Sequence, residues 1–294
     1  MHGALPYAAK NYRREAPVAE SRDVLERLEQ RVMLAVSAVL DNSVLTVRAG
    51  PGNDVITIDL ADGQLSVRIN SAVFAAPAAD VKRIRVYAEA GNDRVTIAQT
   101  VRIRADLWGG PGNDQLSGGP LPCRLYGEAG HDTLLGGGSK DVLVGGAGVD
   151  TVDYSSRTQP LRISLDGRAN DGEAPREGYA GEFDNIAPDV ENVRGGSGDD
   201  SIVGSNGRNT LIGGAGNDTL SGLGGDDVLV GGDGDDLLLG GDGDDILLGI
   251  DANAGDTLDG GDGYDSATVD LVNDQKDSLL NIEDEVQTLL RSTS

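Results

Sequence analysis

Residues 195–248 read GGSGDDSIV GSNGRNTLI GGAGNDTLS GLGGDDVLV GGDGDDLLL GGDGDDILL, which are six consecutive rows of nine residues with one shared pattern. A shorter block from residue 127 reads GEAGHDTLL GGGSKDVLV GGAGVDTVD. Regular repeats of this kind are typical of solenoids, in which each unit is stable only when it stacks on its neighbours. The hexapeptide G-G-x-G-x-D occurs in full at Gly109, Gly145, Gly195, Gly213, Gly231, Gly240 and Gly260.

Each row divides into a turn and a short strand. The first six residues are mostly Gly, Asp and Asn, which accept the positive φ angles of tight turns. The last three residues form a strand whose middle residue is aliphatic, so a single apolar side chain per row points inward. These middle residues are Leu134, Leu143, Val152, Ile202, Leu211, Leu220, Leu229, Leu238 and Leu247. The pattern predicts an all-β fold, a parallel β-roll or β-solenoid with short terminal caps.

Two rows make one coil of 18 residues, so residues i and i+18 lie above one another, about 4.8 Å apart. The sixth-position aspartates therefore stack, for example Asp114 on Asp132 and Asp218 on Asp236. Carboxylates at this distance repel each other by several kcal/mol at an effective dielectric constant of about 20, so the stack needs a cation. Oxygen ligands without imidazole or thiolate favour Ca²⁺ or Mg²⁺, and flexible turn carbonyls suit the looser geometry of Ca²⁺.

The rows resemble the nonapeptide repeats of the RTX, or haemolysin-type, calcium-binding family, a parallel β-roll. The resemblance covers residues 109–153 and 195–270, and we interpret residues 109–153 and 193–270 as two β-roll blocks. It implies that several Ca²⁺ ions lie between successive turns, held by turn carbonyls and the sixth-position aspartates. The implied metal ligands are Asp114, Asp132, Asp141, Asp150, Asp200, Asp218, Asp227, Asp236, Asp245, Asp256 and Asp265.

Three rows depart from the pattern. In GGPLPCRLY, from residue 118, the sixth position is Cys123, so Asp141 lacks a carboxylate partner below it. Asn209 is a neutral replacement for aspartate in its row. Two extra residues after Leu248 place Asp256 and Asp265 at a spacing of 20 from their partners, which predicts a bulged turn and a vacant site.

Composition excludes several classes of function. The 49 acidic and 24 basic residues give a net charge of -25, which disfavours nucleic acid and anionic membranes as partners. No apolar run is long enough for a membrane span. One cysteine and two histidines exclude an intrachain disulfide, a thiolate cluster and a multi-histidine metal centre.

The flanking segments carry weaker signals. Residues 41–108 alternate like strands and contain the turns AGPGND and AEAGND, so we predict a wider, degenerate β-solenoid section there, with Asp54 and Asp93 as further calcium candidates. Its longer coils are expected to come from longer strands. Trp108 packs at the join of the two sections in one interpretation and stacks on a sugar in the other.

Residues 154–192 interrupt the repeats, as a plain surface loop or as a site that recognises a partner. Residues 1–40 form a leader or a cap, because ERLEQRVMLA resembles the LEPR-like leader of bacterial surface and secreted proteins. Residues 271–294 form a C-terminal cap or a secretion tail.

No catalytic constellation is recognisable. There is no G-x-S-x-G motif, and His131 occupies a variable turn position. Carboxylates that repeat identically also lack the distinct environment that a general acid requires. We therefore predict a non-enzymatic calcium-binding protein, secreted or on the bacterial cell surface, whose folding is coupled to Ca²⁺ binding. The alternative is an accessory or carbohydrate-binding module of a secreted polysaccharide-active enzyme system, with an extracellular polysaccharide as partner.

Overall fold

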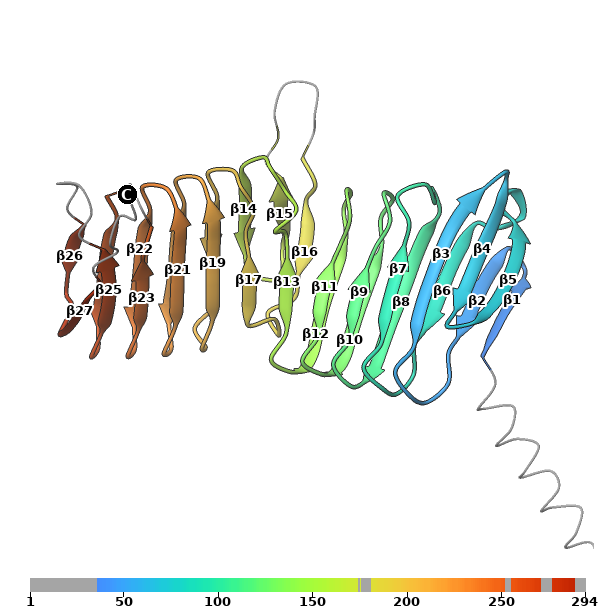
Figure 1. The fold of residues 1–294 in the computed structure, drawn as a ribbon, viewed down its shortest axis with the longest axis horizontal. Coiled ribbons are helices and arrows are strands. Elements are labelled where there is room, and N and C mark those ends of the chain that lie inside the picture. The colour runs from blue at the N-terminus through green and yellow to red at the C-terminus, as the bar shows by residue number, and fades with distance from the viewer. Residues whose placement is uncertain (1–35, 174, 176–180, 252–254, 271–276, 289–294) are drawn as a thin grey trace, which may run out of the picture. The chain divides into compact units, whose positions relative to one another are not determined.

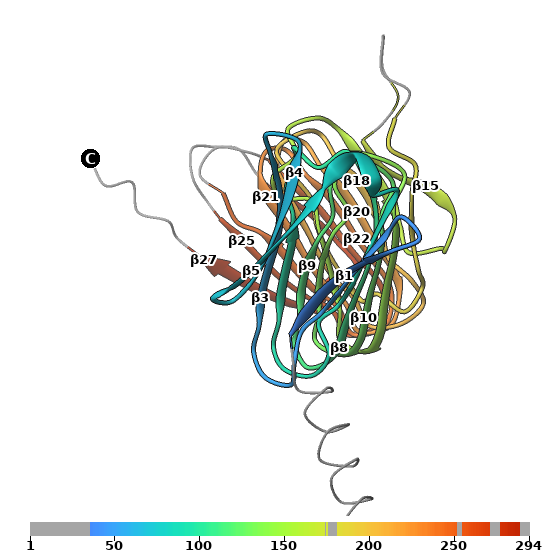
Figure 2. The same cartoon turned by 90° about the vertical axis from the view of Figure 1, so that its right-hand side faces the viewer.

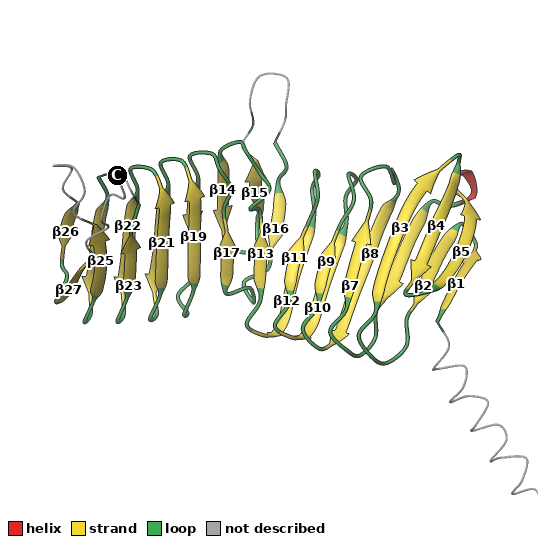
Figure 3. Ribbon diagram, viewed as in Figure 1, coloured by secondary structure: helices red, strands yellow, loops and turns green. Residues whose placement is uncertain are grey.

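The computed structural model describes residues 36–173, 175, 181–251, 255–270 and 277–288. The chain separates into two compact units, Met1–Ala35 and Val36–Ser294, and every described residue belongs to the second. The leader or cap expected at residues 1–40 and the C-terminal cap or tail at 271–294 therefore lie largely outside the described residues. Strands dominate the described part, in which the one helix is the short 3₁₀ turn η1 (Ala78–Asp80; Figure 3). None of its helices has the length and hydropathy of a membrane span.

The strands form two sheets that both run along the length of the solenoid (Figure 1). The first sheet has 14 strands. In spatial order they are β1 (Ser37–Asp41), β2 (Val44–Arg48), β6 (Arg83–Tyr87), β8 (Arg104–Pro111), β10 (Arg124–Gly130), β12 (Val142–Gly148), β16 (Asp184–Ile186), β15 (Ala169–Glu173), β14 (Leu161–Ser164), β18 (Ser201–Val203), β20 (Thr219–Gly224), β22 (Leu237–Asp242), β24 (Thr257–Asp262) and β26 (Ser278–Leu280).

The second sheet has 13 strands. In spatial order they are β27 (Asp284–Thr288), β25 (Ser266–Asp270), β23 (Ile246–Gly249), β21 (Val228–Asp233), β19 (Thr210–Ala215), β17 (Asn192–Arg194), β13 (Thr151–Asp153), β11 (Thr133–Leu135), β9 (Gln115–Ser117), β7 (Arg94–Ile97), β3 (Val55–Ala61), β4 (Gln64–Ile69) and β5 (Ala72–Pro77). Successive coils lie behind one another when the molecule is viewed from the end that carries β1 (Figure 2).

The register confirms the winding of two rows per coil. Leu125 pairs with Leu143 in the first sheet and Leu211 pairs with Leu229 in the second, each 18 residues later in parallel strands. All nine of the predicted inward side chains have no exposed surface. A parallel β-solenoid with one aliphatic side chain per row is therefore the observed fold, and its narrow core explains the low aromatic content.

The section before Gly109 is built differently from the expectation. Strand β3 spans seven residues, which is no longer than β10 and β12 of the roll, and the 39-residue interval between Asp54 and Asp93 also contains β4 and β5. Strand β4 pairs antiparallel with β3, β5 pairs antiparallel with β4, and β7 returns parallel beside β3. An antiparallel extension, rather than longer strands, thus adds residues to that interval.

The segment 154–192 is part of the first sheet and not a bare surface loop. Strand β14 pairs parallel with β18, β15 runs antiparallel between β14 and β16, and β16 continues the sheet from β12. The second sheet passes directly from β13 to β17. The insertion therefore adds strands to one sheet while the other sheet keeps its uninterrupted parallel stacking.

Candidate metal centre

A ladder of side chains, all carboxylates except Asn209, runs along the second sheet. Each member precedes a strand, and its backbone N–H donates to a side-chain oxygen of the next member, except at Glu191, whose backbone carbonyl instead accepts the amide nitrogen of Asn209. Asp114 donates in this way to Asp132 Oδ1 at 2.7 Å, and Asp132 donates to Asp150 Oδ1 at 2.8 Å. The first ladder consists of Asp54, Asp93, Asp114, Asp132, Asp150, Glu191, Asn209, Asp227, Asp245, Asp265 and Glu283.

A second ladder precedes the strands of the first sheet. Asp200 N–H donates to Asp218 Oδ1, and Asp218 N–H donates to Asp236 Oδ1, both at 2.7 Å. The insertion divides this ladder into two parts. The second ladder consists of Cys123, Asp141 and Asp184 before the division, and of Asp200, Asp218, Asp236, Asp256 and Asp277 after it.

The predicted ligands are buried, and most keep one oxygen without a hydrogen-bond partner. All eleven are at most 3% exposed. Nine of them have a buried Oδ2 with no partner; Asp200 differs, because its Oδ2 accepts the N–H of Gly196 at 2.8 Å. Asp54 and Asp93 share the unpartnered Oδ2. Because a buried oxygen normally has a partner, this recurrence indicates that a cation or a proton belongs there.

Main-chain carbonyls lie close to these unpartnered oxygens. A Cβ placed on Gly213 would lie against Asp218 Oδ2 and 2.8 Å from the carbonyl oxygen of Gly231, one coil further on. Glycine is thus required at Gly213, because a side chain would fill the space between two oxygens. A carbonyl has no proton to donate to a carboxylate, so the pair gains nothing without a cation. Carboxylate and carbonyl oxygens are the ligands that Ca²⁺ prefers.

The electrostatics show the cost of these ladders when no cation is bound. The pKa of Asp218 is raised to about 7, chiefly by burial and in addition by the adjacent carboxylates Asp200 and Asp236. Burial likewise raises the pKa of Asp114 to about 7. Both carboxyls are thus more difficult to ionise in the fold than in water, and a divalent cation would reverse that penalty.

Side chains alone do not form a metal cage. In the described ranges, no group of three or more His, Cys, Asp or Glu side chains converges on one point. A cation between coils must therefore take part of its ligands from turn carbonyls. The donor set fits Ca²⁺ and does not fit Zn²⁺, which selects nitrogen and sulfur ligands.

The three expected departures have different outcomes. Cys123 does occupy a ladder position, and its N–H donates to Asp141 Oδ1 at 2.7 Å. Asn209 keeps both ladder neighbours, since its N–H donates to Asp227 Oδ1 and its amide nitrogen donates to the Glu191 carbonyl, but its Oδ1 accepts the Ser205 N–H instead of an N–H of the neighbouring coil. At the 20-residue spacing the ladder is intact, with Asp236 N–H donating to Asp256 Oδ1 at 2.9 Å, while residues 252–254 of the expected bulge lie outside the described residues.

The sequence prediction missed several ladder members. Asp184 lies in the insertion, and Glu191 and Glu283 place a longer carboxylate in an aspartate position. Only the E-N-V step at residues 191–193, which matches the start of a strand, gave a signal for Glu191. The first ladder also includes Asp93 and Asp54, which the sequence indicated only through the turn motifs AEAGND and AGPGND.

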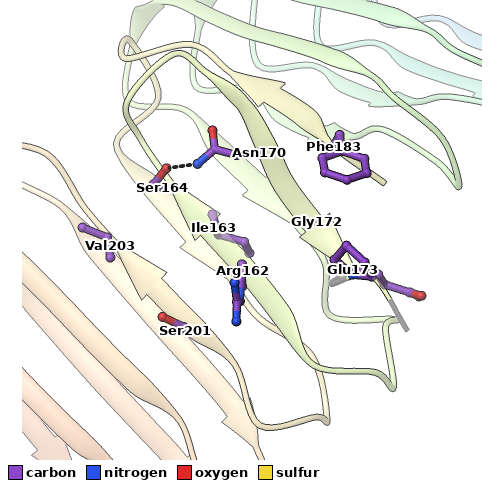
Figure 4. Close-up of a pocket in the computed structure, with 10 residues that line it drawn as sticks. Arg162, Ile163, Ser164, Asn170, Gly172, Glu173, Phe183, Ser201 and Val203 are labelled. Carbon is purple, nitrogen blue, oxygen red and sulfur yellow. Dashed lines mark hydrogen bonds between the residues drawn. The ribbon is translucent and has the colours of Figure 1, made fainter. Parts of the chain in front are cut away.

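A hollow of about 590 Å³ is lined by strands β14, β15 and β18 and by Phe183, which directly precedes β16 (Figure 4). Ile163, Val203 and Phe183 contribute apolar surface, while Arg162 and Glu173 are charged side chains at its wall. Among the described residues that line the hollow there is neither a histidine nor an aspartate. Recognition of a partner by this insertion stays a prediction.

Comparison with known protein families agrees with the geometry. Residues 106–120, 124–152, 194–229 and 221–249 match the RTX calcium-binding nonapeptide repeat, in four copies. No curated protein matches the chain. The matched segments contain Asp114 and Asp132 of the first ladder and Asp218 and Asp236 of the second, and they end before Asp256.

Proposed function

From the RTX calcium-binding nonapeptide repeats that the chain contains, which bind multiple Ca²⁺ ions in a β-roll, we propose that it is a non-enzymatic calcium-binding protein. The protein is secreted or lies on the cell surface, and its roll folds when the ladders bind Ca²⁺. The proposed ligands are the eleven sixth-position aspartates together with Asp54 and Asp93. The observation that carries this proposal is the series of buried Oδ2 atoms without partners, each repeated from coil to coil.

The charge distribution supports coupling between folding and calcium. Residues 109–294 contain 36 acidic and ten basic residues, and the ladders bring many of those carboxylates into buried stacks. Without a counter-ion the stacks repel, and the single aliphatic residue per row adds little hydrophobic burial. In a cytosol low in calcium the roll would stay open, whereas extracellular modules bind Ca²⁺ with dissociation constants of about 10⁻⁴–10⁻³ M.

A calcium titration followed by circular dichroism tests the proposal. The full chain in chelator should show a partial strand signal that rises cooperatively as Ca²⁺ is added through the millimolar range. Mg²⁺ at the same concentrations is the control, because it prefers a tight octahedron and keeps its water molecules. A strand signal that is already complete in chelator would contradict coupled folding.

One surface favours the alternative function of a polysaccharide-binding module. Arg83 and Arg104 lie beside each other on the outer face of the first sheet, and Arg85, Asp106 and Arg124 form the next row, between the arginine pair and the row of Tyr87, Trp108 and Tyr126. The Trp108 ring lies 4.6 Å from Tyr87 and 5.5 Å from Tyr126, nearly parallel to both. Because both faces of Trp108 are covered, a sugar cannot stack on it, and recognition would depend on arginine and acidic groups of the polymer.

Affinity electrophoresis of the calcium-loaded chain in gels that contain polygalacturonate tests this alternative. The substitution Arg104→Gln should weaken any retardation, whereas Arg94→Gln, on β7 of the opposite sheet, should not. Equal migration in polygalacturonate and in a neutral glucan would remove the alternative.

A further inference from the structure

The second ladder is interrupted at a place where the chain supplies its own cation. The turn 136–141 ends in Asp141, and the next carboxylate in the ladder is Asp184, which is 43 residues later instead of 18. The regular next row is absent, and the insertion occupies its place in the sheet. Arg157, from the start of the insertion, lies at this turn and lines a hollow of about 310 Å³ with Gly136, Gly137 and Tyr154.

The Arg157 side chain joins the turn to the insertion. Its Nη2 lies 2.6 Å from Glu182 Oε1 and also donates to the carbonyl oxygen of Gly137. Glu182 is 1% exposed and the Arg157 side chain 21% exposed, so the ion pair is largely removed from water. A cation thus contacts a carboxylate from one coil and a turn carbonyl from the previous coil.

The acidic groups around Arg157 need that charge. Asp141 is buried and its Oδ2 has no hydrogen-bond partner. Asp184 is also buried, and its Oδ2 accepts the Tyr154 hydroxyl at 2.8 Å. Burial raises the pKa of both carboxyls, and the nearby Arg157 opposes this shift at Asp141. Arg157 is the basic side chain that forms an ion pair with this group of acids within the described residues.

We propose that the Arg157 guanidinium takes the place of one calcium ion, between the turn 136–141 and the coil that contains Glu182 and Asp184. The inference rests on the proposed function, because it assumes that the other inter-coil spaces take Ca²⁺. A guanidinium and a calcium ion both bring positive charge to carboxylate and carbonyl oxygens, but the guanidinium is covalently tethered and always present. The junction between the first β-roll block and the insertion therefore closes without calcium.

Substitution of Arg157 should turn this position into a calcium site. In Arg157→Gln, the carboxylates of Asp141 and Glu182 and the carbonyl of Gly137 lose their cation and become available to Ca²⁺. Arg162→Gln is the matched control, because it removes the same charge from an exposed residue of the same insertion. Arg157→Lys keeps the charge and should keep the wild-type calcium count.

The measurement is the number of Ca²⁺ ions bound per full-length chain, by equilibrium dialysis with atomic emission, together with the calcium dependence of the strand signal. We expect Arg157→Gln to bind one more ion than the wild type, and Arg162→Gln and Arg157→Lys to match the wild type. An unchanged count in Arg157→Gln overturns the inference, and so does failure of this variant to fold at any calcium concentration while Arg157→Lys folds. If no protein, including the wild type, binds Ca²⁺, the proposed function itself is wrong.

Discussion

Replacement of Asp218 by alanine tests the ladder at a point where both neighbours are carboxylates. Asp218 Oδ1 accepts the N–H of Asp200, its own N–H donates to Asp236, and its Oδ2 faces the carbonyl of Gly231. Adjacent carboxylates about 4.8 Å apart repel by about 3.5 kcal/mol at an effective dielectric constant of about 20. The substitution relieves this repulsion without calcium and removes a ligand when calcium is present.

Of the two consequences of Asp218→Ala, the loss of calcium-dependent stability is larger than the relief of repulsion between carboxylates. One site with free Ca²⁺ at about 100 times its dissociation constant stabilises the folded state by about 2.7 kcal/mol. Because Asp218 borders two inter-coil spaces, its removal should cost about 5 kcal/mol of calcium-dependent stability. For a chain of this size, that loss lowers Tm in saturating calcium by about 10–20 °C.

Thermal unfolding across a calcium series provides the assay, with Asp233→Ala as control because Asp233 is an exposed acid at the end of β21, in the other sheet. Asp141→Ala should lose less than Asp218→Ala, since Asp141 has Cys123 on one side and Arg157 near its other side. Equal Tm losses in the Asp218 and Asp233 variants, or in the Asp218 and Asp141 variants, would refute the role of the stacked carboxylates.

Three further predictions follow from the ladders and turns. Asn209→Asp should lower the calcium concentration at half-maximal strand signal, because it restores a carboxylate between Glu191 and Asp227, while the exposed control Asn206→Asp should not. In chelator, the roll should gain strand signal as the pH falls from 8 to 5, because burial raises the pKa of Asp218 and Asp114 in the fold to about 7 from 3.8. The stabilisation from proton uptake by these carboxyls is complete below their pKa in the unfolded chain and is lost as the pH rises through about 7, their pKa in the fold. A strand signal that instead decreases as the pH falls would contradict this prediction. Gly112→Ala should destabilise the calcium-loaded chain by more than about 3 kcal/mol in denaturant unfolding, because φ is +142° and a Cβ would meet the Gly91 carbonyl, whereas Gly138→Ala, with open space, should change stability by less than about 0.5 kcal/mol.

The nine-residue period was sufficient to predict the roll. One aliphatic residue in each row fixed which side chains are inward, and the 18-residue coil then placed Asp114 over Asp132 and Asp200 over Asp218. These predictions succeeded because the register of a parallel solenoid follows from the row length alone. The structure adds that each aspartate also holds a backbone N–H of the neighbouring coil, which a count of spacings does not reveal.

The insertion could not be predicted, because its contacts do not repeat. Asp184 joins the second ladder through strand β16, and Glu191 joins the first ladder with a longer side chain. The ion pair of Arg157 with Glu182 links residues that no periodic pattern relates. For the same reason, the antiparallel β4 and β5 were mistaken for longer strands of a wider coil.

We expect the two parts of the described solenoid to depend on calcium to different degrees. Residues 36–108 contain eight acidic and eight basic residues, and their core includes large side chains from paired hairpins, such as Ile56, Ile58 and Leu65. The second block, residues 193–270, buries one aliphatic residue in most rows and carries a large excess of acids. We therefore expect hydrophobic burial to hold the first section together without ions, and the roll to fold only when its carboxylates are neutralised.

Limited proteolysis of the full chain in chelator separates these contributions. Cleavage should begin within residues 193–270 and leave a resistant fragment that spans residues 36–108, and calcium should protect both regions. Hydrogen exchange monitored by mass spectrometry gives the same comparison at the level of peptides, with slow exchange at β3, β4 and β6 in both conditions and calcium-dependent exchange at β19–β23. Loss of protection at the same rate in both regions would mean that the solenoid unfolds as one unit, and that ion binding stabilises the hairpin section as strongly as the roll.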